Sequence, residues 1–110
     1  MELLKIALKA AEEKKAINPL ILDLTGISGV TDYFLIGSGN NPVQVRAIAD
    51  HIVDQLAEAG FTVTRKEGYA EGRWVLLDFG NVVIHILHQE EREFYSLESL
   101  WYDARIVQLA

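Results

Sequence analysis

The sequence contains no cysteine, and it has no apolar run that approaches the length of a membrane helix. Without cysteine the chain has no disulfide framework, no thiolate metal site and no cysteine nucleophile. A membrane-spanning helix needs about 18 or more apolar residues in succession, and residues 1–5 carry no cationic region followed by such a stretch. No targeting segment is therefore evident, and we expect a cytoplasmic protein that does not contact a membrane.

Positive charge is scarce as well. Ten Lys and Arg stand against sixteen Asp and Glu, which gives a net charge of −6. Such a surface repels phosphate backbones, so nucleic acid is not expected as the main direct contact, whereas a basic protein partner suits it. Half of the 110 residues are hydrophobic, which excludes intrinsic disorder and favours a single domain over residues 1–110.

Hydrophobic periodicity predicts eight elements in the order α-β-β-α-β-β-β-α. The expected helices cover residues 1–15, 40–59 and 90–105, and the expected strands cover residues 20–24, 33–36, 61–65, 74–79 and 82–88. The strand–helix–strand step over residues 33–65 is expected to place two strands parallel through a right-handed crossover. The fold class is therefore α/β or α+β, with a mixed five-stranded sheet flanked by helices.

The last two strands are expected to form a hairpin whose two faces differ in character. Gly80-Asn81 suits a two-residue type II′ turn, which places Phe79 opposite Val82. One face is then apolar throughout and must be covered by helices; it consists of Val75, Leu77, Phe79, Val82, Ile84 and Ile86. The other, which we name the mixed face, consists of three opposed pairs: Trp74 with Leu87, Leu76 with His85, and Asp78 with Val83.

Two interpretations of the mixed face stand side by side. Asp78 and His85 are diagonal neighbours about 7–8 Å apart, so the face could be a second core face in which they satisfy each other. Alternatively, its mixture of apolar, acidic and aromatic side chains is typical of a surface that a partner covers. Trp74 follows the polar loop 67–73, so we expect its ring to be half exposed.

Signals of catalysis are incomplete. Gly37-Ser38-Gly39 lies between a strand and a helix, as phosphate-binding loops do, but Pro42 breaks the pattern G-x-G-x-x-G and the P-loop lysine is missing. A nucleotidyltransferase site needs a close pair of carboxylates for two metal ions, and no D-x-D or D-x-E occurs. We therefore expect residues 37–39 to form a tight structural turn, with no catalytic residues and no cofactor.

The histidines do not indicate a metal site either. His85 and His88 are three residues apart on a strand, and this odd spacing points their side chains to opposite faces. His51 lies on the middle helix, and a site built from all three histidines is disfavoured.

Aromatic and apolar side chains crowd the last segment, where they suit a core and an interface equally. They are Phe94, Tyr95, Leu97, Leu100, Trp101 and Tyr102. We therefore take seven residues as candidates for partner binding: Trp74, Asp78, His85, Tyr95, Leu97, Leu100 and Trp101.

Five blocks of sequence carry a resemblance to a known family. They are TDYFLI at 31–36, ADHI at 49–52, EG at 67–68, WVLLDFGNVVIH at 74–85 and REFYSLESLW at 92–101. In order and spacing these blocks resemble the ribosomal silencing factor family, also called Iojap-like proteins. The resemblance runs from the first helix to Trp101, and the last two blocks are specific enough to make a chance match improbable.

The resemblance implies a nucleotidyltransferase-like fold without a working active site and a homodimer in isolation. It also implies binding to the large ribosomal subunit through a basic protein of the intersubunit face, the fourteenth in the usual large-subunit numbering. That contact blocks joining of the small subunit and represses translation when nutrients are scarce. No transit peptide is evident, so the bacterial role is implied. The alternative is a nucleotidyltransferase-like enzyme or a nucleotide-binding protein.

Overall fold

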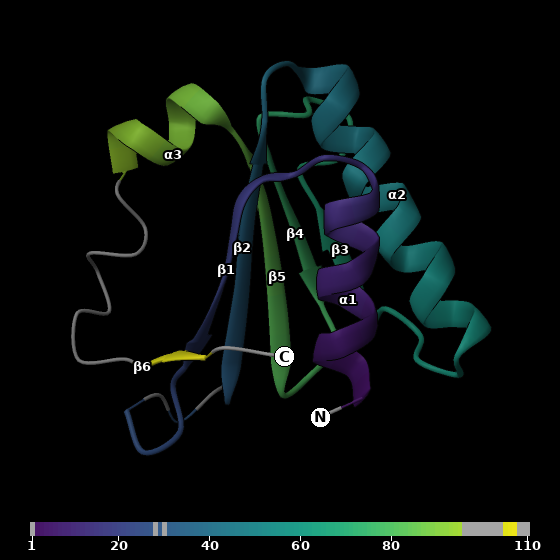
Figure 1. Cartoon of the computed structure of the whole chain (residues 1–110), viewed down its shortest axis with the longest axis vertical. Coiled ribbons are helices and arrows are strands. Elements are labelled where there is room, and N and C mark those ends of the chain that lie inside the picture. Colours follow the sequence, from purple (N-terminus) through teal and green to yellow (C-terminus); the bar gives the residue numbers. More distant parts are fainter. Residues whose placement is uncertain (1, 28, 30, 96–104, 108–110) are drawn as a thin grey trace.

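The computed structural model describes residues 2–27, 29, 31–95 and 105–107 (Figure 1). Its elements are α1 (Glu2–Glu13), β1 (Ile17–Asp23), β2 (Tyr33–Gly39), α2 (Pro42–Glu58), β3 (Arg65–Glu67), β4 (Trp74–Asp78), β5 (Val82–His88), α3 (Gln89–Tyr95) and β6 (Arg105–Val107). The strands form one mixed sheet in the order β3-β4-β5-β2-β1-β6. In it β2 and β5 are parallel, and the other neighbouring pairs are antiparallel.

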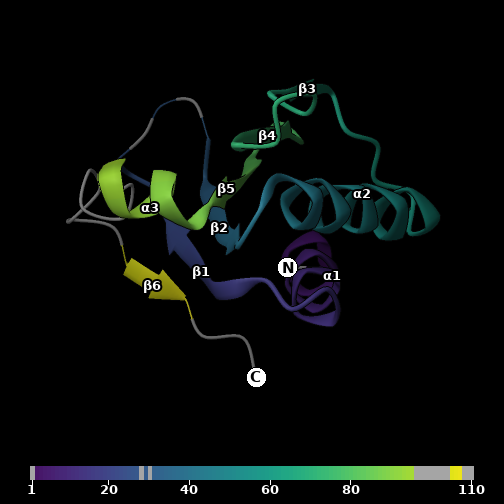
Figure 2. The same ribbon diagram turned by 90° about the horizontal axis from the view of Figure 1, so that it is seen from above.

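The sheet separates the helices into two layers. Helices α1 and α2 lie side by side on one face, and α3 lies on the other side (Figure 2). Leu4, Ile48 and Ile52 from the two helices pack against Leu77 and Ile84 from the sheet in one buried core. Each such side chain stabilises the fold by about 1.5–3 kcal/mol relative to exposure. The mixed α/β class predicted from the sequence is therefore confirmed.

Local signals explain why α2 begins and ends where it does. The Asn41 side chain accepts a hydrogen bond from the Gln44 N–H at 2.9 Å, and Pro42 occupies the first turn. At the other end Gly60 adopts a φ of 93°. Its N–H returns to the Ala57 carbonyl and that of Phe61 to the Leu56 carbonyl, which is a Schellman cap. The predicted middle helix is confirmed at both ends.

The hairpin of β4 and β5 has the predicted register. Trp74 pairs with Leu87, Leu76 with His85 and Asp78 with Val83. Gly80 has a φ of 92° and Asn81 is not among the residues with positive φ, as a type II′ turn requires. The apolar face of the hairpin packs under α1 and α2, so the mixed face is turned away from both.

The sheet has six strands rather than the five that we expected. Residues 61–64 were predicted to be strand, but the ladder with β4 forms only over Arg65–Glu67. The reason is the helix cap: the Phe61 N–H is bound to α2, and Phe61 and Val63 pack on the core without a strand partner. Since β3 follows the direction of β2 but lies beyond β4 and β5, the expected crossover spans two strands.

The two ends of the chain also depart from expectation. The helix predicted over 90–105 is α3 as far as Tyr95, and Arg105 belongs to β6, which pairs with β1; residues 96–104 lie outside the described part. The first strand starts at Ile17 rather than Leu20. A shift of register between Ile17 and Leu20, with Asn18 at a φ of 47°, accommodates the proline at position 19.

Candidate functional site

The mixed face carries a small apolar cluster of its own. Its buried members are Leu22, Leu24, Ile36 and Leu87, and its partly buried members are Leu20, Phe34 and Trp74. These side chains come from β1, β2, β4 and β5, and from Leu24 directly after β1; β2 joins β5 in parallel register, which brings Ile36 beside His85. The mixed face is therefore wider than the hairpin alone, and three of its apolar side chains keep part of their surface accessible.

Trp74 and His85 are joined by a hydrogen bond. The Trp74 indole Nε1 donates to Nδ1 of His85 at 3.1 Å. His85 is 6% exposed, and this burial lowers its pKa to about 4. The imidazole is therefore neutral near pH 7, and because Nδ1 accepts a hydrogen bond, the proton resides on Nε2. Trp74 is partly buried, and it is more buried than the half-exposed ring that we expected.

Asp78 and His85 have other partners, so of the two interpretations of the mixed face the one with a mutually satisfied Asp–His pair is wrong. Asp78 ends β4 beside the turn, where its Oδ1 accepts a hydrogen bond from the Gly80 N–H at 2.8 Å. Its Oδ2 lies 3.7 Å from the Arg65 guanidinium, and a quarter of the side chain stays exposed (25%). His85 instead accepts a hydrogen bond from Trp74. Asp78 thus offers a partly accessible negative charge at the edge of the mixed face.

Helix α3 lies on the same side of the sheet as the mixed face. Arg92 is buried, and its Nη1 donates to the Ile17 carbonyl at 2.9 Å and to Ser38 Oγ at 3.0 Å. These bonds hold α3 against β1 and β2 (Figure 2). Tyr95 is the last residue of this helix. The other three candidates of that segment, at 97, 100 and 101, lie outside the described residues.

The groups that a phosphate-binding loop would use are engaged within the fold. Residues 37–39 are not the tight turn that we expected, because β2 continues through Gly39 and pairs with β5 to His88. Ser38 is fully buried, and its Oγ donates to the Ile17 carbonyl and accepts from Arg92. At the start of α2 the Gln44 side chain accepts from the Asn40 N–H, and the Asn41 side chain accepts from the Gln44 N–H. This arrangement disfavours a nucleotide site there.

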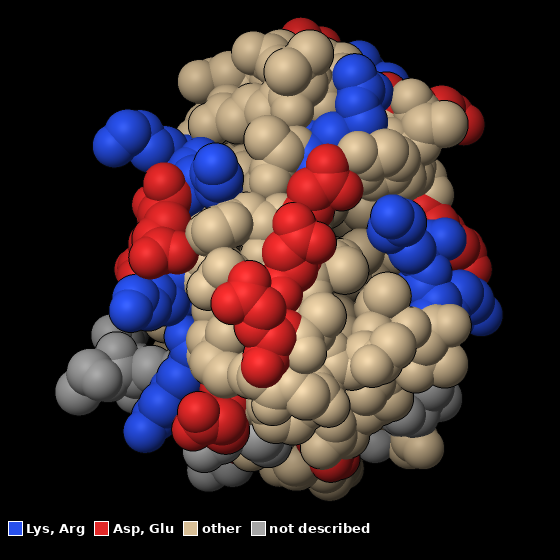
Figure 3. Space-filling view, turned by 90° about the vertical axis from the view of Figure 1, so that its right-hand side faces the viewer, with Lys and Arg blue, Asp and Glu red and all other residues tan. Residues whose placement is uncertain are grey.

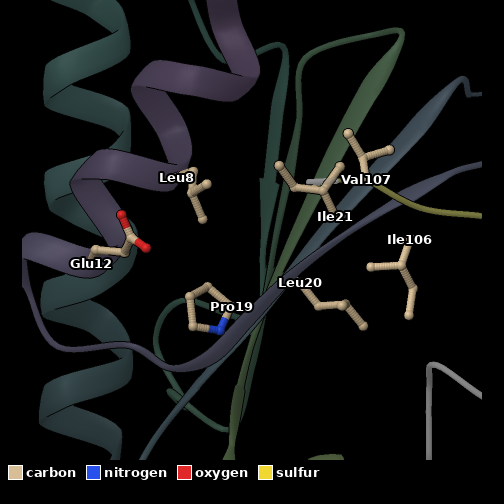
Figure 4. A pocket seen from close by; sticks show the side chains of 7 residues that line it. All are labelled: Leu8, Glu12, Pro19, Leu20, Ile21, Ile106 and Val107. Atoms are coloured by element: carbon tan, nitrogen blue, oxygen red, sulfur yellow. The ribbon is translucent and has the colours of Figure 1, made fainter. Parts of the chain in front are cut away.

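The described histidines take part in hydrogen bonds within the fold rather than in a shared metal site. His51 bonds to Glu13 at 2.8 Å, and Nδ1 of His88 accepts from the Glu90 N–H. Within the described ranges there is no cluster of three potential metal ligands. A hollow of about 180 Å³ lies between α1 and the β1–β6 edge (Figure 4); it is lined by Leu8, Glu12, Pro19, Leu20, Ile21, Ile106 and Val107. It is smaller than the roughly 300–1,000 Å³ of small-molecule sites.

Charge is distributed differently over the two sides of the sheet. On the helical side α2 exposes Asp50, Asp54 and Glu58 at intervals of four residues, and acidic side chains run in a line down that side with basic ones at its margins (Figure 3). Among the described residues, no helix has both the length and the apolar character of a membrane span. Near the mixed face, Asp78 and the exposed Glu90 of α3 supply the negative charge.

Comparison with known proteins gives a consistent result. The family described as "Ribosomal silencing factor during starvation" matches residues 1–110. The chain is 51% identical to ribosomal silencing factor RsfS of Bacillus subtilis, over 97% of this chain and 91% of that protein. It is 46% identical to the protein of the same name from Halalkalibacterium halodurans, over 98% and 92%. A crystal structure of a Bacillus halodurans protein superposes with a TM-score of 0.87 at 44% identity, covering 98% of both chains.

Proposed function

Because this chain belongs to the ribosomal silencing factor family, a family of regulators associated with the ribosome, we propose that it binds the large ribosomal subunit and keeps the small subunit from joining. Translation is thereby repressed when nutrients are scarce. The observation that carries this proposal is the family match over the whole chain, together with 51% identity to a ribosomal silencing factor. The mechanism is steric, so it requires no catalytic group and no cofactor.

The partner in this proposal is a basic protein of the intersubunit face, the fourteenth of the large subunit, and the docking surface is the mixed face. Trp74 supplies apolar ring area and Asp78 a partly exposed carboxylate, a combination that suits a basic partner. His85 belongs to this surface through Trp74. We further propose that Tyr95, Leu97, Leu100 and Trp101 contribute from the segment that α3 begins. The net charge of −6 favours the same class of partner over nucleic acid.

We also propose that the protein is cytoplasmic, is a homodimer when free and is not an enzyme. The internal hydrogen bonds of Ser38 and Arg92 support the last point, since they use the groups that a nucleotide would need. Nucleotide turnover with Mg²⁺ that survives purification and is lost in Ser38→Ala would contradict it.

The central experiment is sedimentation of the purified protein with isolated large subunits, followed by addition of small subunits. We expect the protein to travel with large subunits and to reduce the fraction of joined ribosomes. Trp74→Ala is expected to weaken binding about 30- to 1,000-fold while the protein stays folded, as truncation of an interface anchor does. A collapsed thermal midpoint, or unchanged binding by the folded variant, would reject Trp74 as the anchor.

A matched pair of charge variants tests the choice of surface. Asp78→Asn removes a carboxylate charge from the mixed face, and Asp54→Asn removes one from the exposed side of α2. We expect only Asp78→Asn to weaken binding to large subunits. An equal effect of the two substitutions would show that net charge, rather than the mixed face, governs the interaction.

A further inference from the structure

The single hydrogen-bond donor of the Trp74 side chain is already used inside the protein. An indole has one N–H, and in Trp74 it points to Nδ1 of His85 at 3.1 Å. His85 is itself fixed by its surroundings. Its ring meets Phe34 edge to face, with centroids 4.5 Å apart and planes at 71°, and only 6% of the residue is exposed. The acceptor that Trp74 binds is thus buried and held in one orientation.

We propose that His85 is a positioning residue of the docking surface, which holds the Trp74 indole so that Trp74 meets the large-subunit protein with ring carbon alone. This inference rests on the proposed function. Since the N–H is turned toward a buried group, the accessible part of Trp74 is aromatic carbon. The contacting side chain of the partner is then a cation over the ring, Arg or Lys, as expected of a basic protein. A hydrogen-bond acceptor is not the contact of Trp74.

The contribution of His85 is pre-organisation. A tryptophan that is free to rotate must be immobilised when the partner binds, whereas Trp74 held by His85 is immobilised beforehand. We expect loss of the acceptor to weaken binding to large subunits about 3- to 10-fold. Loss of the ring itself, in Trp74→Ala, has the larger effect given above.

Two substitutions of His85 separate the acceptor from the bulk of the side chain. His85→Asn retains an acceptor, because Oδ1 of Asn stands at the same number of bonds from Cβ as Nδ1 of His. His85→Leu fills the site with an apolar group that cannot accept. In nitrogen-15 spectra we expect the wild type to show the Nε2–H tautomer of His85 and an indole N–H of Trp74 that exchanges slowly with solvent. In His85→Asn the indole N–H should stay protected from exchange. In His85→Leu it should lose this protection, and binding to large subunits should weaken about 3- to 10-fold.

Trp74→Phe tests which part of the indole contacts the partner, even where a His85 variant fails to fold. Phenylalanine keeps an aromatic face but has no N–H, so we expect binding closer to wild type than to Trp74→Ala. The same spectrum assigns the Trp74 signal, because the other tryptophan, Trp101, is unchanged. Binding by Trp74→Phe as weak as that of Trp74→Ala would show that the N–H meets the partner and would overturn the inference.

Two further outcomes are decisive. A folded His85→Leu protein with a protected indole N–H and unchanged affinity would also overturn the positioning role. If the wild type does not sediment with large subunits, the proposed function fails and the partner contact with it. In that case the tautomer and the indole exchange still report whether His85 holds Trp74, so the two failures are distinguishable.

Discussion

At His85, burial couples the charge of one side chain to the stability of the whole fold. Burial lowers the pKa of the imidazole from 6.5 to about 4, so the neutral form is preferred in the folded state. Below pH 6.5 His85 binds a proton in the unfolded chain but stays neutral in the folded one. The stabilisation is therefore complete above pH 6.5, is lost as the pH falls toward 4, and changes no further below that. Over this window the loss is on the order of 3 kcal/mol.

We predict that His85→Asn flattens this dependence, because asparagine does not titrate. The free energy of unfolding should fall between pH 6.5 and about 4 in the wild type and much less in the variant. Urea unfolding at a series of pH values measures both. The hydrogen bond to His51 lowers the pKa of Glu13, so protonation of Glu13 also lowers the free energy of unfolding at acid pH, in the wild type and in His85→Asn alike. The substitution His51→Gln removes this contribution. Identical slopes for wild type and His85→Asn would contradict the prediction.

Gly68 and Gly26 have similar backbone angles but different surroundings. Their φ values are 77° and 80°, in the left-handed region that side chains disfavour. A Cβ on Gly68 would overlap the carbonyl oxygen of Trp74, whereas a Cβ on Gly26 would meet nothing within 4 Å. We predict that Gly26→Ala costs about 1–2 kcal/mol from the backbone alone, and that Gly68→Ala costs at least about twice as much and displaces Trp74. Denaturant unfolding compares them, and equal losses would refute the role of the overlap.

At the scale of elements, the parts that could be predicted are those whose signals are local. The turn and the register of the hairpin were predicted from Gly80-Asn81, and the ends of α2 from Asn41, Pro42 and Gly60. Each of these residues determines the backbone only of its close neighbours in the sequence. The predicted strand 61–65 overlaps β3 at Arg65 alone, and β6 was not predicted at all. Each is three residues long and exists through its pairing with β4 or β1, so its own sequence carries too few positions to show an alternation.

In the candidate site, too, the positions set by local signals could be predicted and the long-range side-chain contacts could not. The faces of the hairpin follow from the register, so Trp74, Asp78 and His85 were placed correctly on one face. The partners of those side chains were not predictable, because they depend on reach and rotamer. Asp78 turns to the Gly80 N–H rather than to His85, and His85 is a hydrogen-bond acceptor for Trp74. The burial of Arg92 was not predicted, since an arginine in a charged helical stretch gives no sign that it will be buried.

We predict that Arg92 is the anchor of α3. Replacing it with glutamine removes the donor that the Ile17 carbonyl and Ser38 Oγ share and leaves these groups only their bond to each other, at a cost of about 1–3 kcal/mol. Hydrogen exchange in residues 89–95 should accelerate by a larger factor than in β5. Arg73→Gln is the matched control, because Arg73 is 46% exposed and pairs with Glu91 at the surface, where such pairs are worth about 0–1 kcal/mol. Equal exchange rates in the two variants would contradict the anchoring role.

For the molecule as a whole, charge and apolar surface favour two different associations. The net charge of −6 favours a basic partner, and its effect is screened as salt is added. The partly exposed apolar side chains of the mixed face, Leu20, Phe34 and Trp74, favour association that salt does not weaken. Ionic strength can therefore separate the two kinds of contact in one preparation of protein.

On this basis we predict that the free protein is a dimer and that the dimer persists in high salt. The partly buried apolar side chains on the second face of the sheet, Leu20, Phe34 and Trp74, are expected to become buried against another copy, because burial stabilises by about 25 cal/mol per Å². Light scattering at micromolar concentration should give twice the monomer mass of 12.3 kDa at low and at high salt. Sedimentation with large subunits should decline over the same salt series. A single 12.3 kDa species at all micromolar concentrations would contradict the dimer, and dissociation by salt would show that charge pairs, rather than apolar area, hold the copies together.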